Sequence, residues 1–277
     1  MGLAAPVLTR DAERFAAATE AFLLANPVEH NIVYTVLDGV RQSGGEARFG
    51  WVEEDGEIAG AVLRTPPRGM LASTMSEAAA RALMPALLEE DPELPGVGGP
   101  EPAATYLAQA WRTQTGGTFG RGIGHVVYVL DRVEPPAQPP PGGARLGTPD
   151  ERDLLVRWTA EFAREAGITG ADAAAMVDGG LAAEHLWVWD DGGPVAMTGR
   201  FVPVDGVVRI SQVYTPPEAR RRGLGSALVA AVSERLLAAG ARRCTLNADR
   251  ENLSTNAIYQ AIGYRRAGDV QEYTFGG

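Results

Sequence analysis

Apolar and polar residues recur with helical and strand-like periods along the second half of the chain. Leu155, Trp158 and Phe162 are spaced by three and four residues, which predicts an amphipathic helix. Short apolar runs bounded by Asp-Asp-Gly-Gly and Val-Asp-Gly turns predict three antiparallel strands after it. We expect, in order, a helix over 149–166, strands over 186–189, 194–202 and 207–214, a helix over 218–239, a strand over 243–247, a helix over 253–262 and one or two strands from Tyr264.

The first half of the chain repeats this order in outline. We expect a helix over 11–26, strands over 48–53, 57–63 and 70–74, a helix over 76–90 that Ser76 caps, a helix over 101–112 and a strand over 125–130. The repetition lies in the order of the elements and not in the residues. The predicted fold class is α/β (α+β, mixed sheet), built as two copies of one fold.

A proline-rich segment separates the two halves. The run Glu134-Pro-Pro-Ala-Gln-Pro-Pro-Pro-Gly-Gly143 has no amphipathic pattern. Proline fixes the backbone and removes amide donors, so an extended linker is predicted. We therefore divide the chain into a first domain over 1–134, a linker over 135–143 and a second domain over 144–277. The length of 277 residues fits two domains, at about 150 residues for each.

Charge and composition exclude several classes of function. The formal net charge is −10, which disfavours nonspecific binding to nucleic acid or to an anionic membrane. All 25 basic residues are arginine, so the chain has no lysine to form a Schiff base or to serve a P-loop. The N-terminus lacks a signal-peptide pattern, and no apolar run approaches the ~18 residues of a membrane helix. A cytoplasmic location is therefore expected.

Metal and disulfide chemistry is not expected. Cys244 is the only cysteine, which leaves no intrachain disulfide and no CxxC site. His30, His125 and His185 are scattered, and no two of them have the spacing of metal ligands.

The segment with the clearest chemical signal joins a predicted strand to a predicted helix. It contains Arg220-Arg-Arg-Gly-Leu-Gly225 at the start of an amphipathic pattern. Glycines leave backbone amides uncovered at the positive end of the helix dipole, where phosphates bind, and the arginines add charged donors. The segment matches neither Walker A nor GxGxxG. A polyphosphate ligand is predicted, and the alternative is a solvated, arginine-rich helix cap.

A second segment makes this prediction more specific. It runs from Leu246 to Tyr264 as a strand, a polar loop and a short helix. Together the two segments resemble the GNAT superfamily of acyl-CoA-dependent N-acyltransferases, whose pyrophosphate loop is Gln/Arg-x-x-Gly-x-Gly/Ala. The family's later Asn-x-x-Ala-x-x-x-Tyr-x-x-x-Gly-Phe pattern is present in shortened form, as Asn256, Ala257, Tyr259, Gly263 and Tyr264. The resemblance covers about residues 144–275.

The resemblance implies roles for particular residues. The main chain of 213–215 is expected to lie along the pantetheine arm of acetyl-CoA. The amides and arginines of the loop before the predicted helix are expected to bind its pyrophosphate. Two asparagines are expected near the pantetheine or a phosphate. The implied cofactor-binding residues are Val213, Tyr214, Thr215, Arg220, Arg221, Arg222, Gly223, Leu224, Gly225, Ser226, Asn252 and Asn256.

Tyr259 is the implied catalytic residue, facing the thioester sulfur. Its hydroxyl can protonate the departing thiolate, and general acid help of this kind is worth ~10²–10⁴ in rate; the alternative is a helix residue packed on the sheet. The amine must also lose a proton, but the strand over 207–214 has no carboxylate, unlike many family members. Glu161 and Glu165 are candidates for this role, and solvated surface charge is their alternative. Cys244 has no histidine nearby in sequence, so an acyl-cysteine route is not expected.

The first domain is expected to lack a cofactor loop. Gly120-Arg-Gly-Ile-Gly124 leads into a predicted strand and not into a helix. The segment 72–81 has no glycine pair and no arginine cluster, and Glu77 at its helix start repels an anion. The first domain therefore resembles a degenerate GNAT-like copy, an arrangement found in tandem members such as mycothiol synthase.

The sequence thus predicts an N-acetyltransferase that moves an acetyl group from acetyl-CoA to a primary amine by direct transfer in a ternary complex. One alternative is mycothiol-synthase-like acetylation of a cysteinyl sugar, and another is a non-catalytic acyl-CoA sensor. The expected partners are acetyl-CoA and an amine-bearing acceptor, with no nucleic acid and no membrane. The acceptor and the oligomeric state are left open by the sequence.

Overall fold

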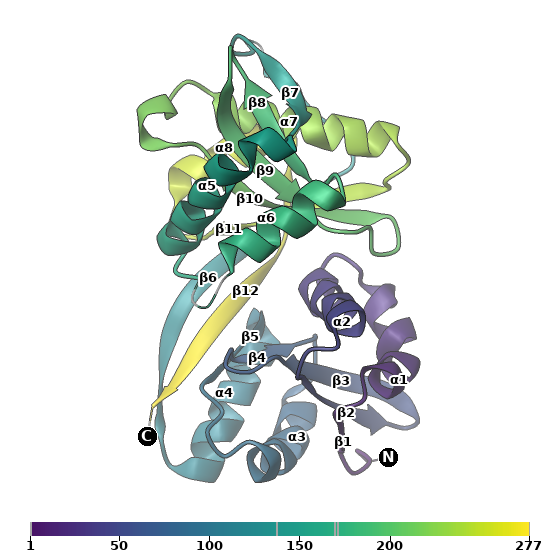
Figure 1. The fold of residues 1–277 in the computed structure, drawn as a ribbon. Helices are drawn as coiled ribbons and strands as arrows, with labels where there is room; N and C mark the ends of the chain where they lie inside the picture. The colour runs from purple at the N-terminus through teal and green to yellow at the C-terminus, as the bar shows by residue number, and fades with distance from the viewer. Residues whose placement is uncertain (1, 137, 169, 171, 277) are drawn as a thin grey trace. The chain divides into compact units, whose positions relative to one another are not determined.

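The computed structural model describes residues 2–136, 138–168, 170 and 172–276. Contacts between Cα atoms group the chain into two compact units. Two long strands, β6 (Thr118–Leu130) and β12 (Arg265–Gly276), contribute residues to both units, which are therefore not consecutive halves of the chain (Figure 1). Unit 1 comprises Met1–Val127, Ala248–Asn252 and Arg266–Gly277, and unit 2 comprises Tyr128–Asn247 and Leu253–Arg265.

The proline-rich segment lies within unit 2, between β6 and the next strand. Its Pro141 carbonyl accepts a hydrogen bond from Trp189 Nε1 at 2.8 Å, so the end of the segment is attached to unit 2. The division of the chain into domains at this segment stays a prediction, because compact units report contacts and not independent folding.

Unit 1 contains a mixed sheet with the strand order β1-β2-β3-β4-β5-β12-β6. Strands β4 and β5 pair in parallel, whereas β1–β2, β2–β3, β3–β4 and β5–β12 are antiparallel. In chain order the elements before β6 are β1 (Val7–Thr9), α1 (Ala12–Ala25), α2 (Asn31–Ser43), β2 (Arg48–Glu54), β3 (Glu57–Arg64), β4 (Met70–Ala72), α3 (Glu77–Glu90), β5 (Gly96–Pro100) and α4 (Glu101–Thr115).

Buried side chains of β3 alternate between the two faces of this sheet, and helices cover both faces. Ala61 and Leu63 are buried in a cluster with residues of α1 and α2, such as Phe15. Val62, which lies between them, is buried with residues of α3 and α4, such as Leu83. Successive side chains of a strand point to opposite faces. Helices α1 and α2 therefore cover one face, and α3 and α4 cover the other.

Ser76 caps α3, as predicted, because its Oγ accepts a hydrogen bond from the Ala79 N–H at 3.1 Å. We expect Ser76→Ala to lower the free energy of unfolding by about 1 kcal/mol, the typical effect of losing an N-cap, in urea unfolding followed by circular dichroism. Thr113→Ala is the control, since that hydroxyl bonds only the Gln109 carbonyl of its own helix. An equal loss in both variants would show that the cap has no specific effect.

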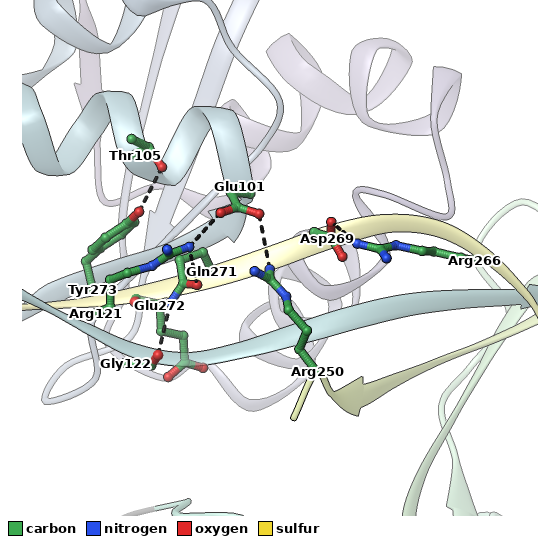
Figure 2. A network of polar contacts seen from close by, with 10 residues as sticks. All are labelled: Glu101, Thr105, Arg121, Gly122, Arg250, Arg266, Asp269, Gln271, Glu272 and Tyr273. Atoms are coloured by element: carbon green, nitrogen blue, oxygen red, sulfur yellow. Dashed lines mark hydrogen bonds and ion pairs between the residues drawn. The ribbon is translucent and has the colours of Figure 1, made fainter. Parts of the chain in front are cut away.

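A polar network in unit 1 attaches α4 to β6 and β12. Glu101, the first residue of α4, accepts hydrogen bonds from Arg121 at 2.6 Å and from Arg250 at 3.1 Å. Figure 2 draws both contacts. Arg121 also donates to Gln271 Oε1 of β12 at 3.0 Å. A carboxylate in the first turn of a helix also interacts favourably with the helix dipole, so Glu101 stabilises both the helix and its attachment to the strands.

The strand order continues as β6-β11-β10-β9-β8-β7, and this part of the sheet is also mixed. Strands β7, β8, β9 and β10 pair antiparallel, and β10 pairs with β11 in parallel. In chain order the elements before β12 are β7 (Gly143–Leu146), α5 (Arg152–Glu165), α6 (Ala173–Ala182), β8 (Leu186–Asp190), β9 (Pro194–Arg200), β10 (Val207–Tyr214), α7 (Leu224–Ala238), β11 (Arg243–Asp249) and α8 (Leu253–Ala261).

Neighbouring side chains of β8 likewise contact helices on opposite faces of the sheet. Leu186 and Val188 are buried with residues of α5 and α6, such as Leu155. Trp187 lies between them in sequence, and the Arg235 guanidinium of α7 lies 5.0 Å from its ring centroid. Because neighbouring side chains of a strand point to opposite faces, α7 lies on the face opposite α5 and α6 (Figure 1).

The α/β fold with a mixed sheet, predicted from the sequence, is confirmed. The order β-α-α-β-β-β-α-β-α-β runs from β1 to β6 and recurs from β7 to β12. The sequence prediction lacks α2, α6, β1, β5 and β7. Among the described residues α6 buries only Val177, so it has no apolar stripe from which a helix is recognised.

The helix predicted from residue 218 is wrong at its start, since α7 begins at Leu224. Residues Pro217–Ala219 form a single 3-10 turn. Arg221 and Gly223 then have positive φ angles of 63° and 74°, which a right-handed helix does not allow. The arginines therefore lie in a loop before the helix and not in its first turn.

Candidate functional site

The parallel pairing of β10 with β11 defines one edge of unit 2. The register runs from Val207 opposite Arg243 to Arg209 opposite Thr245. Parallel strands end at the same edge of a sheet, where ligands of α/β proteins commonly bind. The chain therefore leaves β10 toward α7, and β11 toward α8, at one edge.

The end of β10 is irregular. Its pairing with β9 shifts register between Ser211 and Tyr214, and Gln212 has a φ angle of +55°. A register shift of this kind, as in a β-bulge, bends a strand and re-aims the side chains that follow it. Tyr214, the last residue of the strand, is buried in the cluster beneath α5 and α6.

The loop before α7 presents backbone N–H groups. The first hydrogen bond of the helix runs from Ala227 N–H to Gly223 O at 3.0 Å, so the N–H groups of 224–226 have no acceptor within the helix. Gly223 adopts a left-handed conformation directly before right-handed residues, and this alternation turns successive N–H groups toward one concavity. No acidic residue occupies the first turn of α7. The concavity therefore favours an anion.

The two glycines of this loop are required for different structural reasons. A Cβ on Gly223 would meet no atom within 4 Å, so its positive φ angle is what requires glycine. A Cβ on Gly225 would lie 3.2 Å from Thr215 Oγ1 and 3.8 Å from Val213 Cγ1. Gly225 thus allows the start of α7 to approach the end of β10 closely.

The three arginines of the loop are exposed but differently bonded. Arg220 Nη2 donates to both carboxylate oxygens of Glu165, at 2.8 and 2.9 Å, and its Nε donates to the Thr215 carbonyl at 2.8 Å. Arg222 forms an ion pair with Asp191 at 2.9 Å. For Arg221, no carboxylate partner is found among the residues that the structure describes. Two of the predicted anion donors are therefore held by carboxylates.

Glu161 of α5 binds the end of β10. The Tyr214 hydroxyl donates to Glu161 Oε2 at 2.5 Å. Burial, followed by this hydrogen bond, raises the pKa of Tyr214 to about 12. The structure thus brings a carboxylate to a strand that has none in its own sequence. Sequence reasoning named Glu161 and Glu165 together, and only the fold separates their partners.

Tyr259 is buried on α8, with only 7% of its surface exposed. Its ring packs between Tyr128 and Tyr264, with centroids 6.2 and 6.0 Å away. Burial raises the pKa of Tyr259, so its hydroxyl remains protonated at neutral pH. Asn256 is also buried on α8, whereas Asn252 is exposed in the turn before it. The structure records no contact of Tyr259 with the loop among the described residues.

Cys244 is fully buried at the start of β11, and burial raises the pKa of its thiol to about 12. A thiolate is therefore scarce at neutral pH. No group of three or more His, Cys, Asp or Glu residues in the described part of the chain is arranged to hold a metal ion. Within the same residues, the structure has no helix with the length and apolar character of a membrane span.

The corresponding place in unit 1 differs from the loop of unit 2. Helix α3 follows β4 as α7 follows β10, but the Ser76 hydroxyl caps α3 and Glu77 occupies its first turn. Gly120–Gly124 lies inside β6, so it does not precede a helix. Unit 1 instead has a cavity of about 430 Å³ whose wall includes Thr74, Glu101 and Asp269.

Asp191 is a site residue that sequence reasoning missed. It lies in the Asp-Asp-Gly-Gly turn between β8 and β9, which indicates a hairpin and gives no sign of an ion pair with Arg222. The two residues are 31 positions apart, so only the fold brings them together.

Among known proteins, one family model matches part of the chain, within unit 2 for most of its length. The model of the acetyltransferase (GNAT) family matches residues 153–264. No curated protein matches the chain.

Solved structures resemble the chain over nearly its whole length. One is a GNAT-family acetyltransferase from Colwellia psychrerythraea, with a TM-score of 0.65, 10% identity and coverage of 98% of this chain and 99% of the other. A GCN5-related N-acetyltransferase from Sphaerobacter thermophilus has a TM-score of 0.61, 19% identity and coverage of 97% and 95%. A tandem GNAT protein from the clavulanic acid biosynthesis pathway has a TM-score of 0.57, 14% identity and coverage of 98% of both chains. At these identities the likeness concerns the fold, and it includes both units.

Proposed function

Because the model of the acetyltransferase (GNAT) family matches residues 153–264, we propose that this protein moves the acetyl group of acetyl-CoA to a primary amine. The loop before α7 carries the proposal, since it combines N–H groups that lack helical acceptors with three exposed arginines. Such a helix start suits a pyrophosphate, whose charge interacts favourably with the helix dipole.

The residues of the loop fit this ligand. The amides of 221–226 bind the pyrophosphate, Arg221 adds a charged donor, and Arg220 and Arg222 can exchange their carboxylate partners for phosphate oxygens. Val213 to Thr215 lie along the pantetheine arm, with Asn252 and Asn256 near the pantetheine or a phosphate. Tyr259 lies at the thioester sulfur and protonates the departing thiolate, a role that its protonated state at neutral pH supports.

Acetyl transfer is proposed to be direct, within a ternary complex of protein, acetyl-CoA and amine. The buried and protonated thiol of Cys244 supports this route, because an acyl-cysteine intermediate needs an accessible thiolate. Unit 1 is proposed to be a degenerate copy without a cofactor site, since a serine hydroxyl and a glutamate occupy the helix start where the loop of unit 2 presents N–H groups.

Calorimetry with acetyl-CoA, combined with an assay of free thiol release, tests this function. We expect binding, and turnover when the amines offered are an α-amino peptide, a lysine derivative, a polyamine and an aminosugar. Because all 25 basic residues are arginine, chemical acetylation of the protein's own lysines adds no background. Binding without turnover would instead support an acyl-CoA sensor, and absence of binding would exclude the acetyl donor.

The ion pair between Arg220 and Glu165 is expected to compete with the pyrophosphate. Exposed pairs of this kind are worth about 0.2–1 kcal/mol, and the two side chains are 42% and 37% exposed. We therefore expect Glu165→Gln to lower the Kd for acetyl-CoA by at most about fivefold, and by less at high salt. Calorimetry at low and high NaCl measures this, with Asp153→Asn on the same helix as the control. Weaker binding by Glu165→Gln would contradict the competition.

A further inference from the structure

Acetyl transfer to an amine, the function proposed for this protein and the premise of this inference, requires a group that takes a proton from the amine. An ammonium group has no lone pair with which to attack a carbonyl carbon. Amines are mostly protonated at pH 7, since their pKa values are about 8 for an α-amino group and about 10.4 for a lysine side chain. Strand β10 has no carboxylate in its sequence. A carboxylate that serves there must therefore reach β10 from another element.

The carboxylates around the end of β10 differ in what holds them. Glu165 binds Arg220 through both of its oxygens, and Asp191 is paired with Arg222. In the part of the chain that the structure describes, Glu161 has no cationic partner, and its recorded hydrogen bond comes from the Tyr214 hydroxyl. Its negative charge is thus not neutralised by an arginine, and its second oxygen, Oε1, is left to accept a proton.

Tyr214 fixes the position of Glu161. The tyrosine is only 3% exposed and its ring centroid lies 6.3 Å from that of Trp158 on α5. Since burial and the bond to Glu161 raise the pKa of Tyr214 to about 12, the hydroxyl remains a donor through the neutral and alkaline range. The hydrogen bond to Oε2 therefore holds the carboxylate at the end of β10.

Three charged groups on the elements packed against Glu161 have other partners: Asp178 of α6 with Arg152, Arg209 of β10 over the ring of Phe201, and Arg220 of the loop with Glu165. On α5 itself, Arg157 and Arg164 are exposed, and within the described residues neither forms an ion pair with Glu161. The Tyr214 hydroxyl is thus the titratable group in direct contact with Glu161, and it does not ionise near neutral pH.

We propose that Glu161, positioned by Tyr214, is the base that takes a proton from the acceptor amine. Glu161 Oε1 accepts one proton from the ammonium group, and the freed lone pair forms the N–C bond as the C–S bond breaks. The sulfur leaves with the electron pair and takes a proton from Tyr259. The surplus proton on nitrogen restores the Tyr259 hydroxyl through water, and Glu161 releases its proton to solvent. The products are an amide, free CoA thiol and one proton.

The test compares Glu161→Gln with Asp153→Asn, an exposed carboxylate in the first turn of the same helix. Thiol release is measured from pH 6.5 to 9.5 with whichever of the α-amino peptide, lysine derivative, polyamine and aminosugar reacts fastest. If none of these amines reacts, water is the acceptor. At pH 7 we expect Glu161→Gln to lower the rate about 10²- to 10⁴-fold, with the KM for acetyl-CoA within about twofold and Asp153→Asn unchanged. With an amine, the defect shrinks as the pH rises through the amine's pKa, because the substrate then arrives deprotonated.

Tyr214→Phe separates positioning from proton transfer. Loss of one hydrogen bond is worth about 0.5–1.5 kcal/mol, so we expect a rate about twofold to twelvefold lower, with the pH profile of the wild type. Two results would overturn the inference and leave the proposed function intact. In one, Glu161→Gln keeps the wild-type rate. In the other, its rate with an amine is lower than the wild-type rate by the same factor at every pH. A wild-type protein that consumes no acetyl-CoA with any amine or with water would overturn both.

Discussion

Gly223→Glu is expected to weaken acetyl-CoA binding at least about a hundredfold. Gly223 is the N-cap of α7 and a Cβ there meets open space, so a glutamate side chain projects into the proposed pyrophosphate position. Two unit charges about 4 Å apart near a protein surface repel by about 4 kcal/mol, and a hundredfold loss corresponds to about 2.8 kcal/mol. Calorimetry with acetyl-CoA measures the change in Kd.

Two controls separate charge from backbone strain in this experiment. Gly223→Gln has nearly the same size and the same positive φ angle but no charge, so it is expected to bind more tightly than Gly223→Glu. Gly116→Glu places a glutamate at an open glycine of similar φ, 72° against 74°, in unit 1, and is expected to bind as the wild type does. If Gly223→Glu is folded by circular dichroism and keeps the wild-type Kd, the pyrophosphate does not bind at this loop.

Tyr259→Phe is expected to lower turnover by about 10² to 10⁴ while the Kd for acetyl-CoA changes by less than about twofold. The variant removes a single hydroxyl from a buried ring, so the packing against Tyr128 and Tyr264 is retained. Burial raises the pKa of Tyr259, so the wild-type acid is expected to stay protonated across neutral and alkaline pH and to add no titration there. Steady-state kinetics and calorimetry together measure the effect.

The neighbouring Tyr264 offers a matched control. Its hydroxyl is buried and shares a hydrogen bond of 2.9 Å with Ser233, so Tyr264→Phe also removes one hydroxyl from the same aromatic cluster. Turnover within about twofold of the wild type is expected, accompanied by a loss of stability of about 0.5–1.5 kcal/mol. Equal losses of turnover in both tyrosine variants would point to general disruption of the cluster and against an acid role for Tyr259.

Glu161 and Glu165 illustrate where sequence reasoning about the site ends. They are four residues apart on one helix, and the chain alone gives both the same standing. Folding places Glu161 against Tyr214, 53 residues later, and Glu165 against Arg220, 55 residues later. The difference between a carboxylate without a cation and one neutralised by arginine therefore arises from contacts that no local pattern encodes.

The sequence by itself determined the α/β class, the repeated order of elements and the glycine-arginine loop, because apolar periodicity and glycine act over a few neighbouring residues. It misplaced the start of α7, because the periodic pattern gives no sign that Arg221 and Gly223 have positive φ angles, which end a right-handed helix there. It did not indicate α6, whose one buried residue leaves no apolar stripe. Tertiary structure alone decided which carboxylates bind the loop arginines and which one binds Tyr214 at the end of β10. It also decided that β6 and β12 contribute residues to both compact units. These features depend on contacts between residues far apart in the chain, and such contacts form only when the sheets and helices pack.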